Sequence, residues 1–278
     1  MKFKKVFILT VILICVAPIF AHEFWLQPQQ YLFNEGDEVN IRFRVGDGFA
    51  AGENWKGNQE RVNELKLYYA DVTDNLKTVL SADEGDSVQF SLFEEGTAMV
   101  TFNSVNSYLE LEAAKFNDYL LEDGLTSAID YRKEHNESDS MSREFYQRSV
   151  KTIVQIGPKK TDICKKQTSL PLDIIPLSNP YSLVNLQTLK VKVLFKGQPL
   201  ANAKMSVWYK MPDAVTDTSF VSDANGEISF PVTISGEWMV SCVHMIHLDA
   251  DPKAQWQSYW GSVTWGYTGK AVTSRKSR

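Results

Sequence analysis

Apolar and polar residues alternate in short stretches through the first third of the chain, and this pattern predicts β-strands. Residues Val39–Val45 place every second, apolar side chain on one face, as a half-buried strand does. The stretches 65–70, 88–93 and 97–102 continue the alternation, and turn residues separate them. Antiparallel strands at this spacing favour a β-sandwich over residues 22–166.

The period changes after residue 107, where apolar side chains recur at helical intervals. Leu109, Phe116 and Leu120 belong to one apolar stripe, and Gly124 is placed to end that helix. We therefore predict a helical insertion over about 108–149, in or after the first sandwich. Its helices are expected at about 108–121, 125–135 and 142–149.

Alternation returns in the last third of the chain. Leu189–Phe195 and Lys204–Lys210 each read as a half-buried strand, and Asp223–Gly226 is a turn sequence. These strands predict a second β-sandwich over residues 167–268, immunoglobulin-like or transthyretin-like. The basic tail 269–278 has no apolar pattern, and we expect it to be disordered. The predicted fold is thus mainly β, with two β-sandwich units.

The first 21 residues have the pattern of a secretory signal peptide. Lys2, Lys4 and Lys5 precede an apolar run over 6–14, and Ala21 supplies a small residue at the cleavage site. Cleavage after Ala21 predicts a periplasmic protein. No later apolar stretch is long enough to span a bilayer. The net charge of −5, without a basic stripe, argues against a nucleic-acid partner.

Cleavage there makes His22 the first residue, and a terminal histidine offers its α-amine and its imidazole to one metal ion. Both nitrogens lose their protons near or below neutral pH. His244 and His247 lie at the end of the last long strand, and face opposite sides if that strand continues. We predict an open metal site built from His22, His244 and His247, for copper, nickel, cobalt or zinc.

The histidines also have ordinary explanations. His22 is then merely tolerated as a first residue, His244 is a core histidine bonded to the backbone, and His135 is solvated in a polar loop. A structural zinc site is disfavoured because Cys-x-x-Cys pairs are absent. Three carboxylates are candidates for weak additional ligands, with ordinary surface roles as the alternative: Glu23, Asp249 and Asp251.

Other chemistry finds less support in the sequence. Cys164 and Cys242 remain after signal removal and can pair in an oxidising compartment, but the sequence leaves their separation open. No Gly-x-Ser-x-Gly elbow or phosphate-binding Gly-rich loop occurs. Aromatic residues near the C-terminus either stack on sugar rings or cover the seam between the sandwiches. They are Trp256, Tyr259, Trp260, Trp265 and Tyr267.

Several short sequence motifs, spread over nearly all of the mature chain, are informative when taken together. They are AHEFWLQP at 21–28, KFNDYL and EDGL within 115–125, REFYQR at 143–148 followed by Lys151, PLDIIP at 171–176, VLFKGQPL at 193–200, and GEW, HM and SYW at 236–238, 244–245 and 258–260. This set resembles domain-of-unknown-function family 4198, bacterial exported proteins often labelled periplasmic components of nickel or cobalt uptake systems. The resemblance implies an exported two-part β protein with His22 and His244 in family motifs, whereas His247 falls in none.

The leading hypothesis is a periplasmic protein that binds a divalent transition-metal ion, and delivers it to a membrane uptake system or buffers it, without catalysis. Its partners are then the metal ion and that uptake system, with no nucleic acid and no membrane span after signal cleavage. One alternative is a copper-dependent oxidative enzyme with an N-terminal histidine brace. Another is a structural or carbohydrate-binding sandwich module in which the histidines are incidental.

Overall fold

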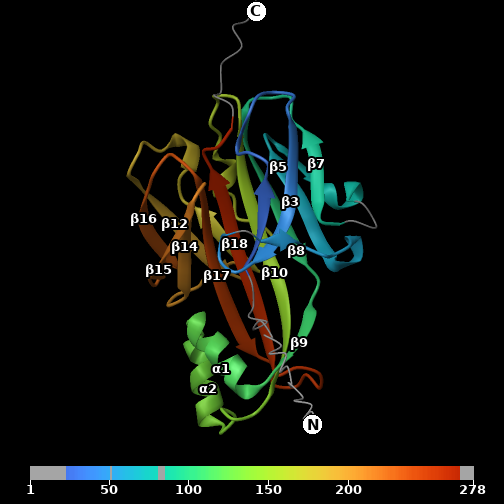
Figure 1. The fold of residues 1–278 in the computed structure, drawn as a ribbon, viewed down its shortest axis with the longest axis vertical. Coiled ribbons are helices and arrows are strands. Elements are labelled where there is room, and N and C mark those ends of the chain that lie inside the picture. The colour runs from blue at the N-terminus through green and yellow to red at the C-terminus, as the bar shows by residue number, and fades with distance from the viewer. Residues whose placement is uncertain (1–22, 51, 81–84, 270–278) are drawn as a thin grey trace, which may run out of the picture.

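A large mixed sheet runs through the molecule (Figure 1). The computed structural model describes residues 23–50, 52–80 and 85–269, and within these residues the sheet has ten strands. Their order is β15 (Ala214–Val221), β14 (Lys204–Met211), β17 (Glu237–His247), β18 (Trp256–Gly266), β10 (Ser142–Ile156), β8 (Gly96–Ser104), β5 (Val62–Tyr69) and β6 (Val72–Asn75), with β2 (Leu32–Phe33) and β9 (Ser107–Leu111) also paired to β10.

Two smaller sheets complete the β structure. The first contains β1 (Glu23–Pro28), β3 (Glu38–Gly46), β4 (Glu53–Asn54) and β7 (Ser87–Ser91), and the second contains β11 (Leu172–Pro176), β12 (Gln187–Phe195), β13 (Gln198–Pro199) and β16 (Glu227–Val232). Short 3-10 helices lie at Gln59–Arg61, Leu76–Val79, Asp162–Lys165 and Pro180–Ser182. The prediction of a mainly β fold with a sandwich arrangement is confirmed.

At β18, the two small sheets pack against opposite faces of the large sheet. The Ser262 hydroxyl donates a hydrogen bond to the Phe24 carbonyl oxygen of β1, 2.8 Å away. A Cβ on the neighbouring Gly261 would lie 3.0 Å from Leu172 of β11. Since successive side chains point to opposite faces, β1 and β11 lie on different sides. All residues of β18 are therefore buried, as in a strand covered on both faces.

Strands β10 and β18 join the two predicted units. They pair in parallel from Glu144 opposite Trp256 to Thr152 opposite Thr264, so hydrogen bonds connect residues of the 22–166 unit to residues of the 167–268 unit. Most of the C-terminal aromatic side chains lie in this junction and are buried. They pack inside the protein, as the seam hypothesis expected, and do not form a sugar-stacking platform.

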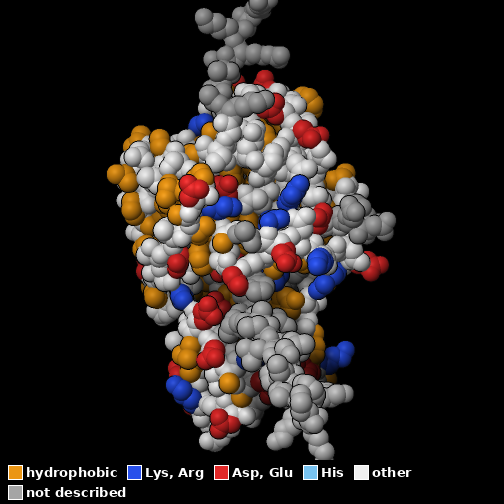
Figure 2. Space-filling view, viewed as in Figure 1, with side chains coloured by type: hydrophobic (Ala, Val, Ile, Leu, Met, Phe, Trp, Pro, Cys, Tyr) orange, Lys and Arg blue, Asp and Glu red, His pale blue; other side chains and the backbone are white. Residues whose placement is uncertain are grey.

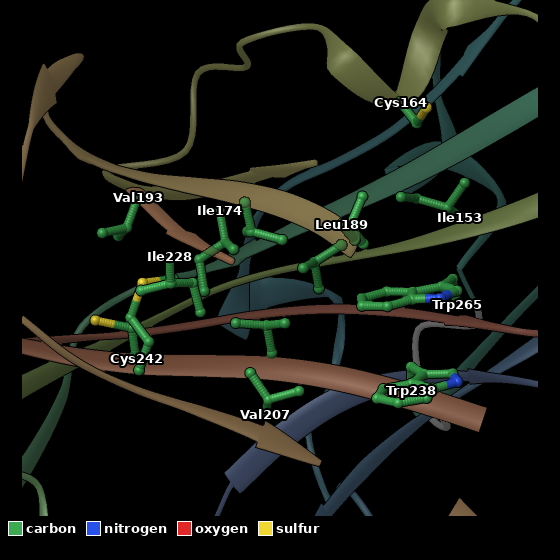
Figure 3. Close-up of a cluster of buried hydrophobic side chains, with 14 of the residues drawn as sticks. Ile153, Cys164, Ile174, Leu189, Val193, Val207, Ile228, Trp238, Cys242 and Trp265 are labelled. Carbon is green, nitrogen blue, oxygen red and sulfur yellow. The ribbon is translucent and has the colours of Figure 1, made fainter. Parts of the chain in front are cut away.

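The core of the second sandwich lies between β11, β12 and β16 and one face of the large sheet (Figure 3). Trp238 and Trp265 stack there in parallel, with ring centroids 6.1 Å apart. Cys164 and Cys242 line opposite ends of this cluster (Figure 3), and both are free thiols. The disulfide that the sequence left open is not formed.

Two helices, α1 (Ala113–Glu122) and α2 (Thr126–Glu134), form the narrow end of the molecule (Figure 1). Phe116 and Leu120 pack with Val243 and Trp256 from the ends of β17 and β18. The predicted helix over 142–149 is wrong, because these residues begin β10. They pair with β9 on one side and β18 on the other, and such non-local pairing overrides local periodicity. Residues 107–111 are likewise strand β9.

The predicted signal peptide, His22 and tail residues 270–278 lie outside the described residues. Within the described part of the chain, no helix has both the length and the apolar character needed to cross a bilayer.

Candidate functional site

His244 and His247 point to opposite faces of β17, as alternation along a continuous strand predicts. The ring of His244 lies 4.3 Å from the ring of Phe195, on the side of the second small sheet. The ring of His247 stacks on Tyr131 of α2, 4.0 Å away, on the other side. The structure therefore does not bring these two predicted ligands together.

Each of these histidines already has a defined environment. Burial, aided by the positive charge of Lys196, lowers the pKa of His244 to about 4. The Nδ1 atom of His247 lies 2.9 Å from a carboxylate oxygen of Asp249. His135 stacks on Tyr131 at 3.9 Å, so the tyrosine ring lies between two imidazoles. Across residues 23–50, 52–80 and 85–269, no three His, Cys, Asp or Glu side chains are arranged to hold a metal ion.

A polar cavity of about 370 Å³ opens at the start of β1, and we call it the acidic pocket. Its carboxylates come from four separate parts of the chain and its basic group is Lys204. The carboxylates are Glu23, Asp47, Glu122, Asp123 and Asp217. Figure 2 shows acidic side chains on the face between the sandwich body and the helical end. The concentration of negative charge favours a cationic ligand.

A second cavity of about 20 Å³ lies next to this pocket, lined also by residues of β17 and β18, and we call it the inner cavity. Glu23, Asp123, Lys204 and Ser206 line both spaces. The inner cavity is large enough for one water-sized body. Glu23 and Asp123 thus line both the larger cavity and the smaller one.

β1 and the loop after β3 position Glu23. Antiparallel pairing sets Glu23 opposite Gly46, and the backbone N–H of Gly48 donates a hydrogen bond to the Glu23 carboxylate, 3.1 Å away. Gly48 has φ +61°, and a Cβ there would lie 2.8 Å from the ring of Trp208. Only glycine fits this turn without displacing the tryptophan.

The C-terminus of α1 positions Asp123. Asp123 is the C-cap residue, and its N–H donates to the Tyr119 carbonyl oxygen at 3.0 Å. Gly124 follows with φ +66°, so the prediction that this glycine ends the helix is confirmed. The negative end of a helix dipole lies here as well, and it adds to the attraction for a cation.

Burial raises the pKa of both carboxyl groups. The pKa of Glu23 is raised by desolvation and, to a smaller degree, by the charges of Glu122 and Asp47. The pKa of Asp123 is raised well above its ordinary value by desolvation, then by Glu23 and Glu122, while Lys204 opposes the shift. Ionised carboxylates are costly in such a place unless a cation compensates them.

Behind the pocket, Glu144 lies among hydrogen-bonding partners and is only 2% exposed. The hydroxyl groups of Tyr119 and Ser258 donate to its Oε1 atom, the former over 3.3 Å. Its Oε2 atom has no partner among the described residues. Burial raises the pKa of Glu144 to about 7.

Sequence reasoning considered Glu23 only as a weak ligand and did not single out Asp123 or Glu144. Carboxylates are common in this chain, which has 34 Asp and Glu residues, so their presence alone carries no signal. Asp123 lies in the block 115–125, whereas Glu23, which lines the same pocket, lies in the block 21–28. Only the fold shows that they meet.

The family model described as "Domain of unknown function (DUF4198)" matches residues 19–246. No curated protein matches the chain.

Among solved structures, the chicken interferon gamma receptor alpha chain is 10% identical, with a TM-score of 0.19, over 80% of this chain and 88% of that one. Three N-terminal domains of the bacteriophage RB49 outer capsid protein Hoc are 12% identical, with a TM-score of 0.19, over 87% and 59%. A tetra-tandem repeat of a large adhesion protein is 10% identical, with a TM-score of 0.21, over 89% and 50%. Likeness at these scores carries no argument about function.

Proposed function

The chain belongs to the DUF4198 family, and on that premise we propose that it is an exported protein that binds a divalent transition-metal ion at the amino end of its mature form. The single observation that supports this function is the position of Glu23. Glu23 is the first described residue, and its side chain lines the acidic pocket together with Asp123. Signal cleavage after Ala21 would leave one further residue, His22, bonded to it.

The chemistry of that new chain end suits a metal ion. Consecutive Cα atoms are about 3.8 Å apart, so the α-amine and imidazole of His22 are tethered within one residue of the half-buried Glu23. Two nitrogen donors next to carboxylates suit Cu²⁺, Ni²⁺, Co²⁺ or Zn²⁺. Because the described residues contain no complete ligand set, the terminal nitrogens are the donors on which this function depends.

The involvement of His244 and His247 stays a prediction. The contact of His244 with Phe195 lies on the face of the large sheet that β1 does not cover. The side chain of His247 packs against α2. We therefore centre the proposed site on His22 and the acidic pocket.

A periplasmic location and a membrane metal-uptake partner complete the proposal. In that setting the protein binds the ion and passes it on or buffers it, with no turnover. Metal binding by deprotonated amine, imidazole and carboxylate groups weakens as pH falls, so release is favoured in an acidified compartment.

The test uses protein exported by its own signal. Intact mass first establishes whether the chain begins at His22, and titration calorimetry with Ni²⁺ and Cu²⁺ then measures affinity. The matched control inserts one Gly between Ala21 and His22, which keeps every side chain but moves the α-amine. We expect the insertion to weaken binding by at least about tenfold.

Two outcomes would overturn the function. One is a correctly processed protein that binds neither ion, and the other is equal affinity in the Gly-insertion variant. The copper-loaded protein is also assayed for peroxide consumption, since turnover would favour the oxidative-enzyme alternative.

A further inference from the structure

We propose that Lys196, His244 and Tyr259 form a binding site for the carboxylate of a small organic acid. The three side chains gather around the ring of Phe195 on the face of the large sheet that carries the second small sheet. β1 and the acidic pocket lie on the opposite face. The site is therefore separate from the proposed metal site and does not depend on it.

The ring of Phe195, at the end of β12, is the centre of this cluster. The rings of His244 and Tyr259 lie 4.3 and 5.0 Å from it. These two residues are opposite each other in the antiparallel pairing of β17 with β18, so their side chains are neighbours on one face. The Lys196 ammonium lies 5.1 Å from the Phe195 ring and 5.8 Å from the Tyr259 ring. One cation and two neutral polar groups thus surround one ring.

The polar atoms of His244 and Tyr259 are not used in the fold. Tyr259 is only 9% exposed, yet its hydroxyl makes no hydrogen bond to any residue that the structure describes. The hydroxyl of buried Tyr181, by contrast, donates to the Ile153 carbonyl oxygen at 2.7 Å. The half-buried imidazole of His244 also has no hydrogen-bond partner in the described ranges. Because buried polar groups normally have partners, these two side chains point to a ligand.

Lys196 determines the sign of that ligand. Its ammonium forms no ion pair with a described residue, whereas Lys192 of β12 pairs with Glu227 at 3.3 Å. Burial and then the charge of Lys196 lower the pKa of His244 to about 4, so the ammonium is near enough to oppose a cation at this imidazole. An anion would gain a charge-assisted hydrogen bond instead. With a single cationic group, a singly charged carboxylate is better matched than a doubly charged phosphate.

The turn between β12 and β13 holds Lys196 in a strained conformation. Lys196 and Gly197 are its two central residues, between the paired Phe195 and Gln198, and their φ values are +48° and +79°. Such turns favour Asn, Asp or Gly at the first central position, because other side chains are strained at positive φ. Strained residues occur most often at functional positions. A ligand that uses the exposed ammonium accounts for lysine at this position.

The experiment follows the imidazole resonances of His244 by nuclear magnetic resonance while sodium acetate is added at neutral pH and constant ionic strength. We expect a saturable shift in the wild type. Lys196→Met keeps the aliphatic stem but removes the charge, and it should weaken acetate binding by at least about tenfold. Tyr259→Phe keeps the ring but removes the hydroxyl, and it should weaken binding by at least about threefold.

Two controls separate contact from general charge and from folding. Lys190→Met removes the same charge from an exposed position on β12, and it should change acetate affinity by less than about twofold. Lys196→Arg keeps a cation and should retain more affinity than Lys196→Met. Urea unfolding of each variant establishes that the native fold is present in the titration.

Three results would overturn the proposal. The first is a wild type without a saturable acetate shift, and the second is equal weakening by Lys196→Met and Lys190→Met. In the third, Ni²⁺ shifts the same resonances and binds more tightly in Lys196→Met, which would show a cation site at His244. Tighter binding of inorganic phosphate than of acetate would overturn the assignment to a carboxylate. The Gly insertion before His22 tests the proposed function separately, so either proposal can fail alone.

Discussion

Lys151 of β10 and Asp173 of β11 form an ion pair that is buried between the large sheet and the second small sheet, with side-chain exposures of 0% and 2%. The Asp173 carboxylate also accepts hydrogen bonds from the N–H and hydroxyl of Thr168, at 2.7 and 3.0 Å. This pair fixes β11 against the strand that joins the two halves of the protein. A pair of charges so placed is costly to break but need not stabilise the fold relative to neutral residues.

Lys151→Met should lower the free energy of unfolding by about 3–5 kcal/mol, because it leaves the buried Asp173 unpaired. The double variant with Asp173→Asn keeps an acceptor for Thr168 and removes the second charge, and it should recover about 1–3 kcal/mol. Urea unfolding of the single and double variants measures both values. A double variant less stable than Lys151→Met would contradict this account.

Glu144 should make the protein less stable as pH rises from 5 to 8. Its pKa is raised from 4.5 to about 7 by burial, so the native state holds a proton that the unfolded chain releases. The stability contributed by that proton is present below pH 4.5 and is lost as pH rises through about 7. Glu144→Gln should flatten the profile and gain on the order of 1–3 kcal/mol at pH 8. Equal pH slopes in denaturant melts of both proteins would argue against a protonated Glu144.

His244 should stay neutral well below neutral pH. Its pKa is lowered from 6.5 to about 4, mainly by burial and also by Lys196. The corresponding stability is present above pH 6.5 and is lost as pH falls through about 4, because the unfolded chain takes up the proton first. Nuclear magnetic resonance of the imidazole should show its titration midpoint near 4, and Lys196→Met should move it upward. A midpoint near 6.5 would show that the ring is solvated.

Cys164 and Cys242 should both be free and unreactive in the native protein. Burial raises the pKa of each thiol to about 12, and only the thiolate reacts readily with disulfide reagents. Titration with an aromatic disulfide should therefore detect neither thiol in buffer and both in guanidinium chloride. Intact mass of natively exported protein checks the result, since the mass of the disulfide form would contradict the prediction that both thiols are free.

The helices and the half-buried strands could be read from the sequence because each has one buried face. The stretch 39–45 lies in β3, 189–195 in β12, and the apolar stripe with Phe116 in α1. The outer strand β1 was missed because Phe24, Trp25 and Leu26 are buried in succession and do not alternate. The sequence predicted only part of the candidate site. The sequence indicated the chelating chain end and His22, but gave no sign that Glu23 and Asp123 line one pocket.

The sequence alone determined the elements with one apolar face and the family, and it predicts a new histidine end after signal cleavage. These depend on residues that are neighbours along the chain, where local periodicity reports burial directly. Only the tertiary structure decided that residues 142–149 extend a strand, that β18 is covered on both faces, and that Glu23 and Asp123 share one pocket. Those relationships arise from pairing between distant segments, and no local pattern specifies which faces will meet.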